Sequence, residues 1–169
     1  EWYGASTGNI NWEQTPIVGG FSSSANSMMV DNYNVYAWGN YCDITAPLDF
    51  NAATDGWLSF DVAYARYSSV NKDSLEILVS PDCGQSWTSV YFKADTDLPT
   101  APDYSGGQFI PTSAQWRKDS VNLSSYIGND NMRITFRNYG GYGQALYVDN
   151  INLGGVSVDI PKKESKFIG

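Results

Sequence analysis

The sequence carries oxygen ligands suited to a hard metal ion at three widely separated places. Asp31 and Asp149 are each followed by an asparagine, and Asp43 precedes an apolar segment. Calcium binds about six to eight oxygen atoms from carboxylates, amides and backbone carbonyls, so these groups have suitable chemistry. No EF-hand loop is present, and a site made of these residues would join distant parts of the chain. The alternative is that each aspartate caps a turn of its own.

Aromatic rings form the second group of candidate residues. The candidate ligand-binding side chains are Tyr36, Trp38, Tyr41 and Tyr142. Gly39 and Asn40 both tolerate positive φ, so we expect an exposed loop over 33–41 with Trp38 at its surface. Exposed aromatic faces stack on sugar rings, while nearby Asn and Asp side chains bond hydroxyl groups. The alternative is that these rings pack over one end of the domain as part of its core.

The absence of histidine narrows the catalytic chemistry open to this chain. Without histidine there is no Ser-His-Asp or Cys-His site, and the usual base near neutral pH is missing. Two distant cysteines are too few for a zinc site. A glycosidase needs only a pair of carboxylates, but the acidic residues here fall mostly in turns and on polar strand faces. We therefore expect no enzymatic activity.

Charge and hydropathy exclude two kinds of partner. The net charge is -8 and the isoelectric point is about 4.3, whereas nucleic acid requires a basic face. No apolar run approaches the ~20 residues that span a bilayer. We therefore expect neither nucleic-acid binding nor membrane insertion.

We also expect one domain over 1–155, a polar linker over 156–169, and a chain that is a segment of a longer protein.

The cysteine content bears on the compartment in which the chain folds. Cys42 and Cys83 both lie in turn-like contexts. For an exported protein we predict a disulfide between them, and the alternative is two unpaired thiols.

Alternation with a period of two residues indicates β structure throughout. In the segment 57–64, one face carries Leu58, Phe60, Val62 and Tyr64, while Ser59 and Asp61 lie on the other. The expected strands are 10–14, 26–30, 44–50, 57–64, 73–80, 87–93, 115–123, 131–137 and 145–153, with a long irregular loop over 99–111. Many short strands separated by turns predict an all-β fold. A two-sheet antiparallel jelly-roll β-sandwich also hides the strand edges.

Several segments in one order carry a resemblance to a known family. They are SMMVDNY (27–33), LSFDVAYA (58–65), DSLEILVS (73–80), DCGQSW (82–87) and YGQALYVDNI (142–151). Together they resemble the MAM-like jelly-roll modules of Bacteroidetes secreted proteins. That group includes the cleaved-adhesin domains of gingipain-type proteases and the choice-of-anchor domains.

The resemblance implies calcium binding and an accessory role outside the cell. The matching calcium positions are Asp31, Asp43 and Asp149, with Glu1 where such domains carry an early glutamate. It further implies a secreted or cell-surface, adhesive or carbohydrate-binding module, with a glycan or host-surface ligand and with other domains of the parent protein as partners. The alternative function is a purely structural spacer that stabilises a secreted hydrolase such as a peptidase.

Overall fold

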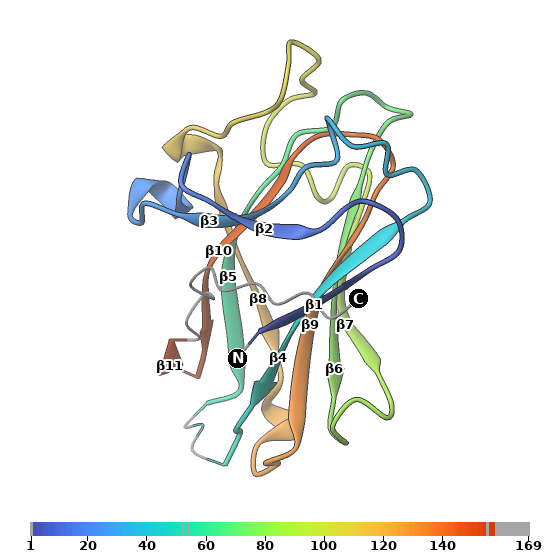
Figure 1. Cartoon of the computed structure of the whole chain (residues 1–169). Helices are drawn as coiled ribbons and strands as arrows, with labels where there is room; N and C mark the ends of the chain where they lie inside the picture. The colour runs from blue at the N-terminus through green and yellow to red at the C-terminus, as the bar shows by residue number, and fades with distance from the viewer. Residues whose placement is uncertain (1, 52, 54, 155, 158–169) are drawn as a thin grey trace.

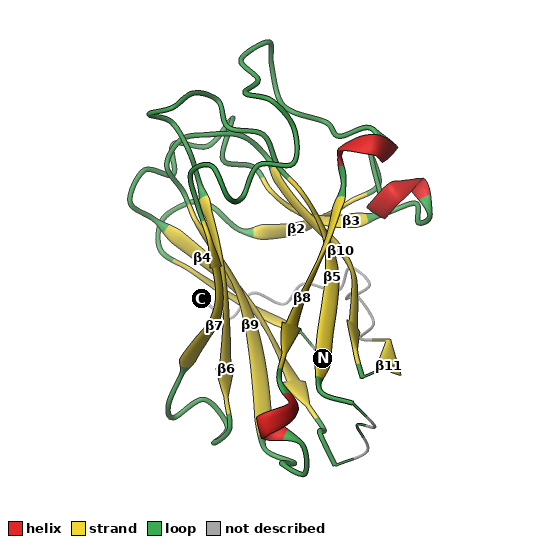
Figure 2. Cartoon of the chain, turned by 180° about the vertical axis from the view of Figure 1, so that it is seen from behind, coloured by secondary structure: helices red, strands yellow, loops and turns green. Residues whose placement is uncertain are grey.

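The computed structural model describes residues 2–157 except 52, 54 and 155, and these residues form two facing β-sheets (Figure 1). The strands are β1 (Tyr3–Ser6), β2 (Trp12–Thr15), β3 (Ser27–Val30), β4 (Tyr41–Leu48), β5 (Trp57–Ala63), β6 (Ser74–Ser80), β7 (Thr88–Lys93), β8 (Arg117–Asn122), β9 (Met132–Tyr139), β10 (Leu146–Leu153) and β11 (Val156–Ser157). Three short 3-10 turns, η1 (Gly20–Ser22), η2 (Ser113–Gln115) and η3 (Ser124–Tyr126), are the helical elements described (Figure 2). None of them is long or apolar enough to cross a membrane.

The order of the strands is that of a jelly roll. The first sheet has the order β1-β4-β9-β6-β7, and the second has β2-β3-β10-β5-β8, with β11 pairing with β10. Strands β3 to β10 therefore build the two four-stranded halves of a jelly roll, while β1 and β2 each extend one edge. The strand pairs described are antiparallel. The predicted all-β, two-sheet antiparallel jelly roll is confirmed.

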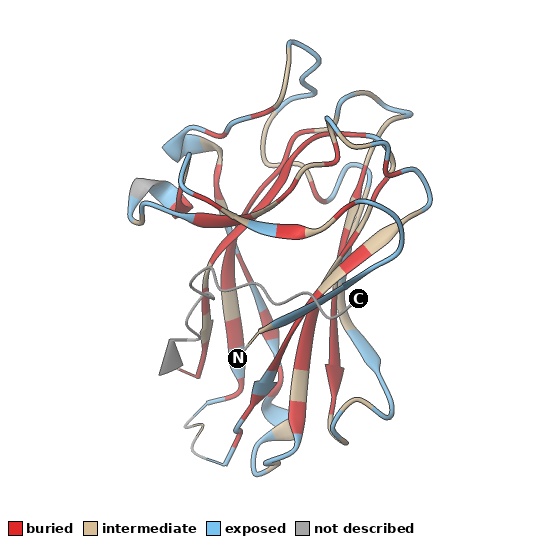
Figure 3. Cartoon of the chain, in the orientation of Figure 1, coloured by how far each residue is buried: buried red, intermediate tan, exposed pale blue. Residues whose placement is uncertain are grey.

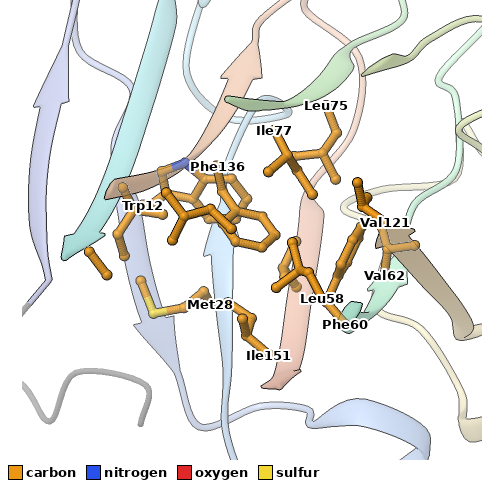
Figure 4. Packing of buried hydrophobic residues seen from close by; sticks show 14 of the residues in the cluster. Trp12, Met28, Leu58, Phe60, Val62, Leu75, Ile77, Val121, Phe136 and Ile151 are labelled. Atoms are coloured by element: carbon orange, nitrogen blue, oxygen red, sulfur yellow. The ribbon is translucent and has the colours of Figure 1, made fainter. Parts of the chain in front are cut away.

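The core lies between the two sheets, where the inward faces of the alternating strands meet. Phe60 of β5 and Phe136 of β9 join the sheets edge to face, with ring centroids 5.4 Å apart. Leu58, Ile77 and Met28 surround this pair (Figure 4). Burial is concentrated in the central strands of each sheet, and the loops and edge strands are more exposed (Figure 3). The alternation of apolar and polar residues along the strands in the sequence therefore reflects the core that the two sheets share.

Each predicted strand has a counterpart in the structure, with boundaries shifted by up to a few residues. Strand β1 was not predicted, because its residues are exposed on both sides and show no alternation. The segment 99–111 contains no strand, as expected. The predicted linker over 156–169 begins within β11, and its remaining residues, 158–169, lie outside the described residues.

The predicted disulfide between Cys42 and Cys83 is wrong. Cys42 lies opposite Asn138, near the C-terminal end of β9. The Cys83 N–H donates to the carbonyl of Asn131, the residue just before the N-terminal end of β9. A strand's length separates positions 131 and 138, ~23 Å at the usual rise per residue. A disulfide requires Cα atoms within about 7 Å of each other. Cys42 is a buried free thiol in the sheet, and Cys83 is an exposed one in the turn between β6 and β7.

Candidate functional site

The loops at one end of the sandwich are held together by a buried carboxylate. Asp73 Oδ1 accepts hydrogen bonds from the N–H groups of Gly141 (2.7 Å) and Gly143 (3.3 Å). Its Oδ2 accepts from the Gln144 N–H (2.9 Å) and from the Tyr64 hydroxyl (3.0 Å). Burial raises the pKa of Asp73 to about 6, and the hydrogen bonds oppose that shift. This side chain fixes the loop 140–145 against the end of β5.

A second buried side chain connects that loop to the long irregular loop. Gln144 Nε2 donates to the carbonyls of Tyr104 (2.9 Å) and Gly107 (2.7 Å), and its Oε1 accepts from the Phe109 N–H (2.8 Å). Beneath it, Asn32 and Asn138 exchange amide hydrogen bonds of 3.0 and 2.9 Å. Satisfied polar networks of this kind rigidify the segments that they join.

The surface of these anchored loops carries exposed aromatic rings. We call this surface the loop end and define it by segments 31–40, 64–73, 94–111 and 140–145. Trp38 is 50% exposed, Tyr36 is 72% exposed and Tyr142 is 42% exposed. The rings of Tyr36 and Tyr142 contact each other, with centroids 5.4 Å apart. The predicted surface position of Trp38 is confirmed, and Gly39 has the positive φ (+75°) that the predicted turn requires.

The charged groups described at the loop end are largely paired with one another. Arg66 contacts Asp103 at 2.8 Å and Asp95 at 2.9 Å. Lys72 contacts the same Asp95 at 2.8 Å. The cations of this region are therefore neutralised locally, and the surface presents ring faces and hydrogen-bonding groups rather than net positive charge.

Tyr41 lies in β4 and not in the predicted loop over 33–41, which therefore ends one residue earlier. It pairs in register with Tyr139 of β9. Its ring stacks on the guanidinium of Arg137, 4.3 Å from the centroid, on the solvent face of the first sheet. Tyr41 is thus separate from the loop rings but directly next to them in the chain.

The expected calcium set of Asp31, Asp43, Asp149 and Glu1 must be corrected. Asp31 Oδ1 accepts from the N–H groups at positions 33 and 34 and so caps its own turn. Asp43, in the first sheet, is bonded by Arg137 at 2.7 and 2.8 Å, while Asp149 is in the second sheet. Glu1 lies outside the described residues. Within the described part of the chain, no three His, Cys, Asp or Glu residues gather in a way that could hold a metal.

Asp149 instead has a carboxylate partner that the sequence did not reveal. Asp61 pairs with Asp149 in register, and both are buried. The Gly20 N–H donates to Asp149 Oδ2 (2.6 Å), and the Ser24 hydroxyl bonds the same oxygen. A Cβ added to Gly20 would lie 2.7 Å from Asp61 Oδ2 and 3.1 Å from Asp149 Oδ2, so both carboxylates converge on η1.

One oxygen of this buried pair lacks a hydrogen bond. Asp61 Oδ2 accepts from the Asn150 amide at 2.7 Å, but the buried Asp61 Oδ1 has no hydrogen-bond partner. The Lys118 ammonium is within ion-pair distance of Oδ1, at 3.1 Å, without hydrogen-bond geometry. Among the described residues, Lys118 is the cation that contacts this buried pair, and it contacts Asp61 and not Asp149.

These features define the class of the molecule as a jelly-roll β-sandwich with anchored loops at one end. Among solved structures, the K1 cleaved adhesin domain of Lys-gingipain from Porphyromonas gingivalis W83 is similar, with a TM-score of 0.59 and 15% identity, covering 88% of this chain and 86% of that one. The Family 11 carbohydrate-binding module from Clostridium thermocellum, in complex with a β-1,3-1,4-mixed-linked tetrasaccharide, has a TM-score of 0.51 and 16% identity, with coverages of 92% and 89%. TmCBM61, in complex with β-1,4-galactotriose, has a TM-score of 0.54 and 11% identity, with coverages of 90% and 86%.

No family model and no curated protein sequence matches the chain. At the identities of the solved structures the likeness establishes the fold. The resemblance to the cleaved-adhesin type of jelly-roll module is confirmed at that level.

Proposed function

We propose that this domain is a non-catalytic, calcium-binding module of a secreted or cell-surface protein, and that its loop end binds carbohydrate. The observation that carries the proposal is the set of exposed rings of Tyr36, Trp38 and Tyr142 on loops anchored from below by Asp73 and Gln144. Exposed aromatic side chains that are grouped on one surface, rather than scattered singly, are typical of interaction sites. Rigid anchoring lowers the entropy lost when the ligand binds. Structures of similar fold that contain oligosaccharides support the same choice of ligand class.

The test compares two tryptophans of equal exposure. Trp38 and Trp57 are each 50% exposed, but Trp57 begins β5 and so lies at the opposite end of that strand from Tyr64 and the loop end. A glycan array identifies ligands, and calorimetry then measures their affinity. We expect Trp38→Ala to weaken binding at least about tenfold, with the melting temperature almost unchanged, and Trp57→Ala to bind like the unmodified domain.

Two outcomes would contradict the carbohydrate proposal. One is the absence of binding to any glycan on the array, which would favour the structural spacer instead. The other is an equal effect of both tryptophan substitutions, which would show that the loop end is not the site.

The calcium part of the proposal rests on Asp61 and Asp149. Their two carboxylates, the Ser24 hydroxyl and the backbone carbonyls of the loop 19–24 are hard oxygen ligands of the kind that calcium takes. The ion pair described at the two buried carboxylates is that of Lys118 with Asp61 Oδ1, which supports a further cation between the Oδ2 atoms near η1. When bound, the ion would tie the loop between β2 and β3 to the centre of the second sheet.

A ligand that binds only the folded state raises stability by mass action. We expect calcium to raise the melting temperature of chelator-treated protein. Asp149→Asn should remove that response, and the control Asp43→Asn should retain it. Melting curves that are identical with calcium and with chelator would refute the calcium site while leaving the glycan proposal open to its own test.

A further inference from the structure

A second aromatic cluster lies on the solvent face of the first sheet, beside the loop end. Tyr41 and Tyr139 are opposite each other on β4 and β9, with ring centroids 6.1 Å apart. The ring of Phe92 in β7 also packs near Tyr139, with centroids 6.5 Å apart. Phe92 is 59% exposed although it sits in a strand, so its ring faces solvent and not the core. These three rings span the sheet from β4 to β7.

A polar network holds the rings of this cluster in place. Arg137 forms a two-pronged ion pair with Asp43 and lies against the Tyr41 ring. The Tyr139 hydroxyl donates to Glu76 Oε2 at 2.7 Å. A carboxylate has about four acceptor sites and a guanidinium has five N–H donors, so Asp43, Glu76 and Arg137 keep hydrogen-bonding capacity for the hydroxyl groups of a ligand. Ring faces and fixed hydrogen-bonding groups thus alternate across one surface.

The charge of this surface restricts the ligand. One guanidinium faces two carboxylates, so the cluster has a net charge of about -1, and the whole chain carries -8. Polyanions are repelled by such a surface. The hydrocarbon chain of a lipid would leave the hydrogen-bonding groups between the rings without partners. A neutral sugar chain matches both the rings and the hydrogen-bonding groups.

The sheet-face cluster is continuous with the loop end. The Gly140 N–H donates to the Asn40 carbonyl at 2.8 Å, and the Gly39 N–H donates to the Gly140 carbonyl at 3.0 Å. These bonds continue the pairing of the two segments beyond the Tyr41–Tyr139 pair of β4 and β9. The Tyr36–Tyr142 ring pair lies further along the same two segments. The two ring pairs therefore lie at neighbouring positions along the same two chain segments.

We propose that Tyr41, Tyr139 and Phe92, with Arg137 and Glu76, form a second sugar subsite next to the loop end, so that the ligand is an uncharged oligosaccharide chain and not a single terminal sugar. This inference rests on the proposed carbohydrate function, because it extends the same binding surface. In this arrangement the loop rings bind the sugar at one end of the oligosaccharide, and the rings of the sheet face bind the sugars that follow.

The test measures affinity against chain length by titration calorimetry. The probes are β-1,4-linked galacto-oligosaccharides and mixed-linked β-gluco-oligosaccharides, from the disaccharide to the hexasaccharide, together with an oligogalacturonate as the anionic counterpart. We expect affinity to rise with length and the anionic chain to bind more weakly. Phe92→Ala should weaken the hexasaccharide about tenfold, ~1.4 kcal/mol, and leave the disaccharide unaffected. Trp38→Ala should weaken both, and Phe92→Tyr should retain the binding of the longer chain.

Each result separates the inference from the function on which it rests. Affinity that is independent of length and unchanged by Phe92→Ala, but lost in Trp38→Ala, overturns the second subsite and leaves the loop-end function standing. No binding of any probe to the unmodified domain overturns both. Nuclear magnetic resonance provides a readout without substitution: the ring signals of Tyr41 and Tyr139 should shift with the hexasaccharide and not with the disaccharide. Unchanged signals at saturation would also overturn the subsite.

Discussion

Replacing Asp73 by asparagine should remove one identifiable part of the pH dependence of stability. Asp73 is buried, and its pKa is raised from 3.8 to about 6, chiefly because burial disfavours the charged form. The folded state therefore binds this proton more tightly than the unfolded state does. Stability from this group is fully present below the unfolded pKa and is lost as the pH rises through about 6.

The magnitude follows from the difference between the two pKa values. About two pKa units at ~1.4 kcal/mol each give ~3 kcal/mol over the whole transition. Carboxylates with a lowered pKa change the stability in the opposite direction as the pH rises. Asp82 is an example, because hydrogen bonds from Ser86 and Ser80 lower its pKa to about 2. Their contribution is common to both proteins, so only the difference between unmodified domain and variant isolates Asp73.

The assay is urea unfolding of the unmodified domain and of Asp73→Asn at about pH 4 and about pH 7. The variant should be less stable at both values, because its amide places N–H groups against donors such as Gly141 N–H. We expect the gap between the two proteins to be larger at the lower pH by ~2 kcal/mol. A gap that is the same at both pH values would refute the assignment of a raised pKa to Asp73.

Three further results are expected from substitutions and labelling elsewhere in the chain. Phe136→Ala should cost ~3–5 kcal/mol of unfolding free energy in chemical denaturation, because it empties the contact between the two sheets; a loss below ~1 kcal/mol would contradict the described core. Gly141→Ala should lower the melting temperature strongly, since a Cβ there lies 1.9 Å from the Lys72 carbonyl oxygen, whereas Gly4→Ala, with its nearest atom at 3.5 Å, should not. Thiol labelling of the unreduced protein should detect one fast-reacting cysteine, Cys83, when folded and two when unfolded, because burial raises the pKa of the Cys42 thiol; no reactive thiol in the unfolded protein would restore the disulfide.

The strands could be predicted because their signal is local. In β9, Met132, Ile134 and Phe136 alternate with the polar residues Arg133, Thr135 and Arg137, so seven or eight residues suffice to identify the pattern. The jelly-roll order then follows from closing two antiparallel sheets, and the resemblance to a known family pointed to the same arrangement. Strand β1 escaped prediction because it packs on only one neighbour and has no buried face.

The buried carboxylate pair could not be predicted, because it depends on long-range register. In the sequence, Asp61 lies with Ser59 on the polar face of an alternating strand. In the structure the same face lies beneath η1 and opposite Asp149, residues that are remote in sequence. The disulfide prediction was wrong for a related reason. The residues around Cys42 and Cys83 indicate turns, but they do not indicate at which end of the sheet each turn lies.

The positions of the polar anchors explain how one sequence gives both a stable sandwich and an adaptable surface. Asp73, Gln144 and the Asn32–Asn138 pair lie just beyond the apolar core, where the strands end. Buried polar groups at that level would cost free energy if the loops moved away, because each donor or acceptor would lose its partner. The loops are therefore held chiefly by hydrogen bonds from these buried side chains to loop backbone groups. The rings of Tyr36 and Trp38 are exposed on these anchored loops, so their replacement should cost little stability, as the Trp38→Ala test requires.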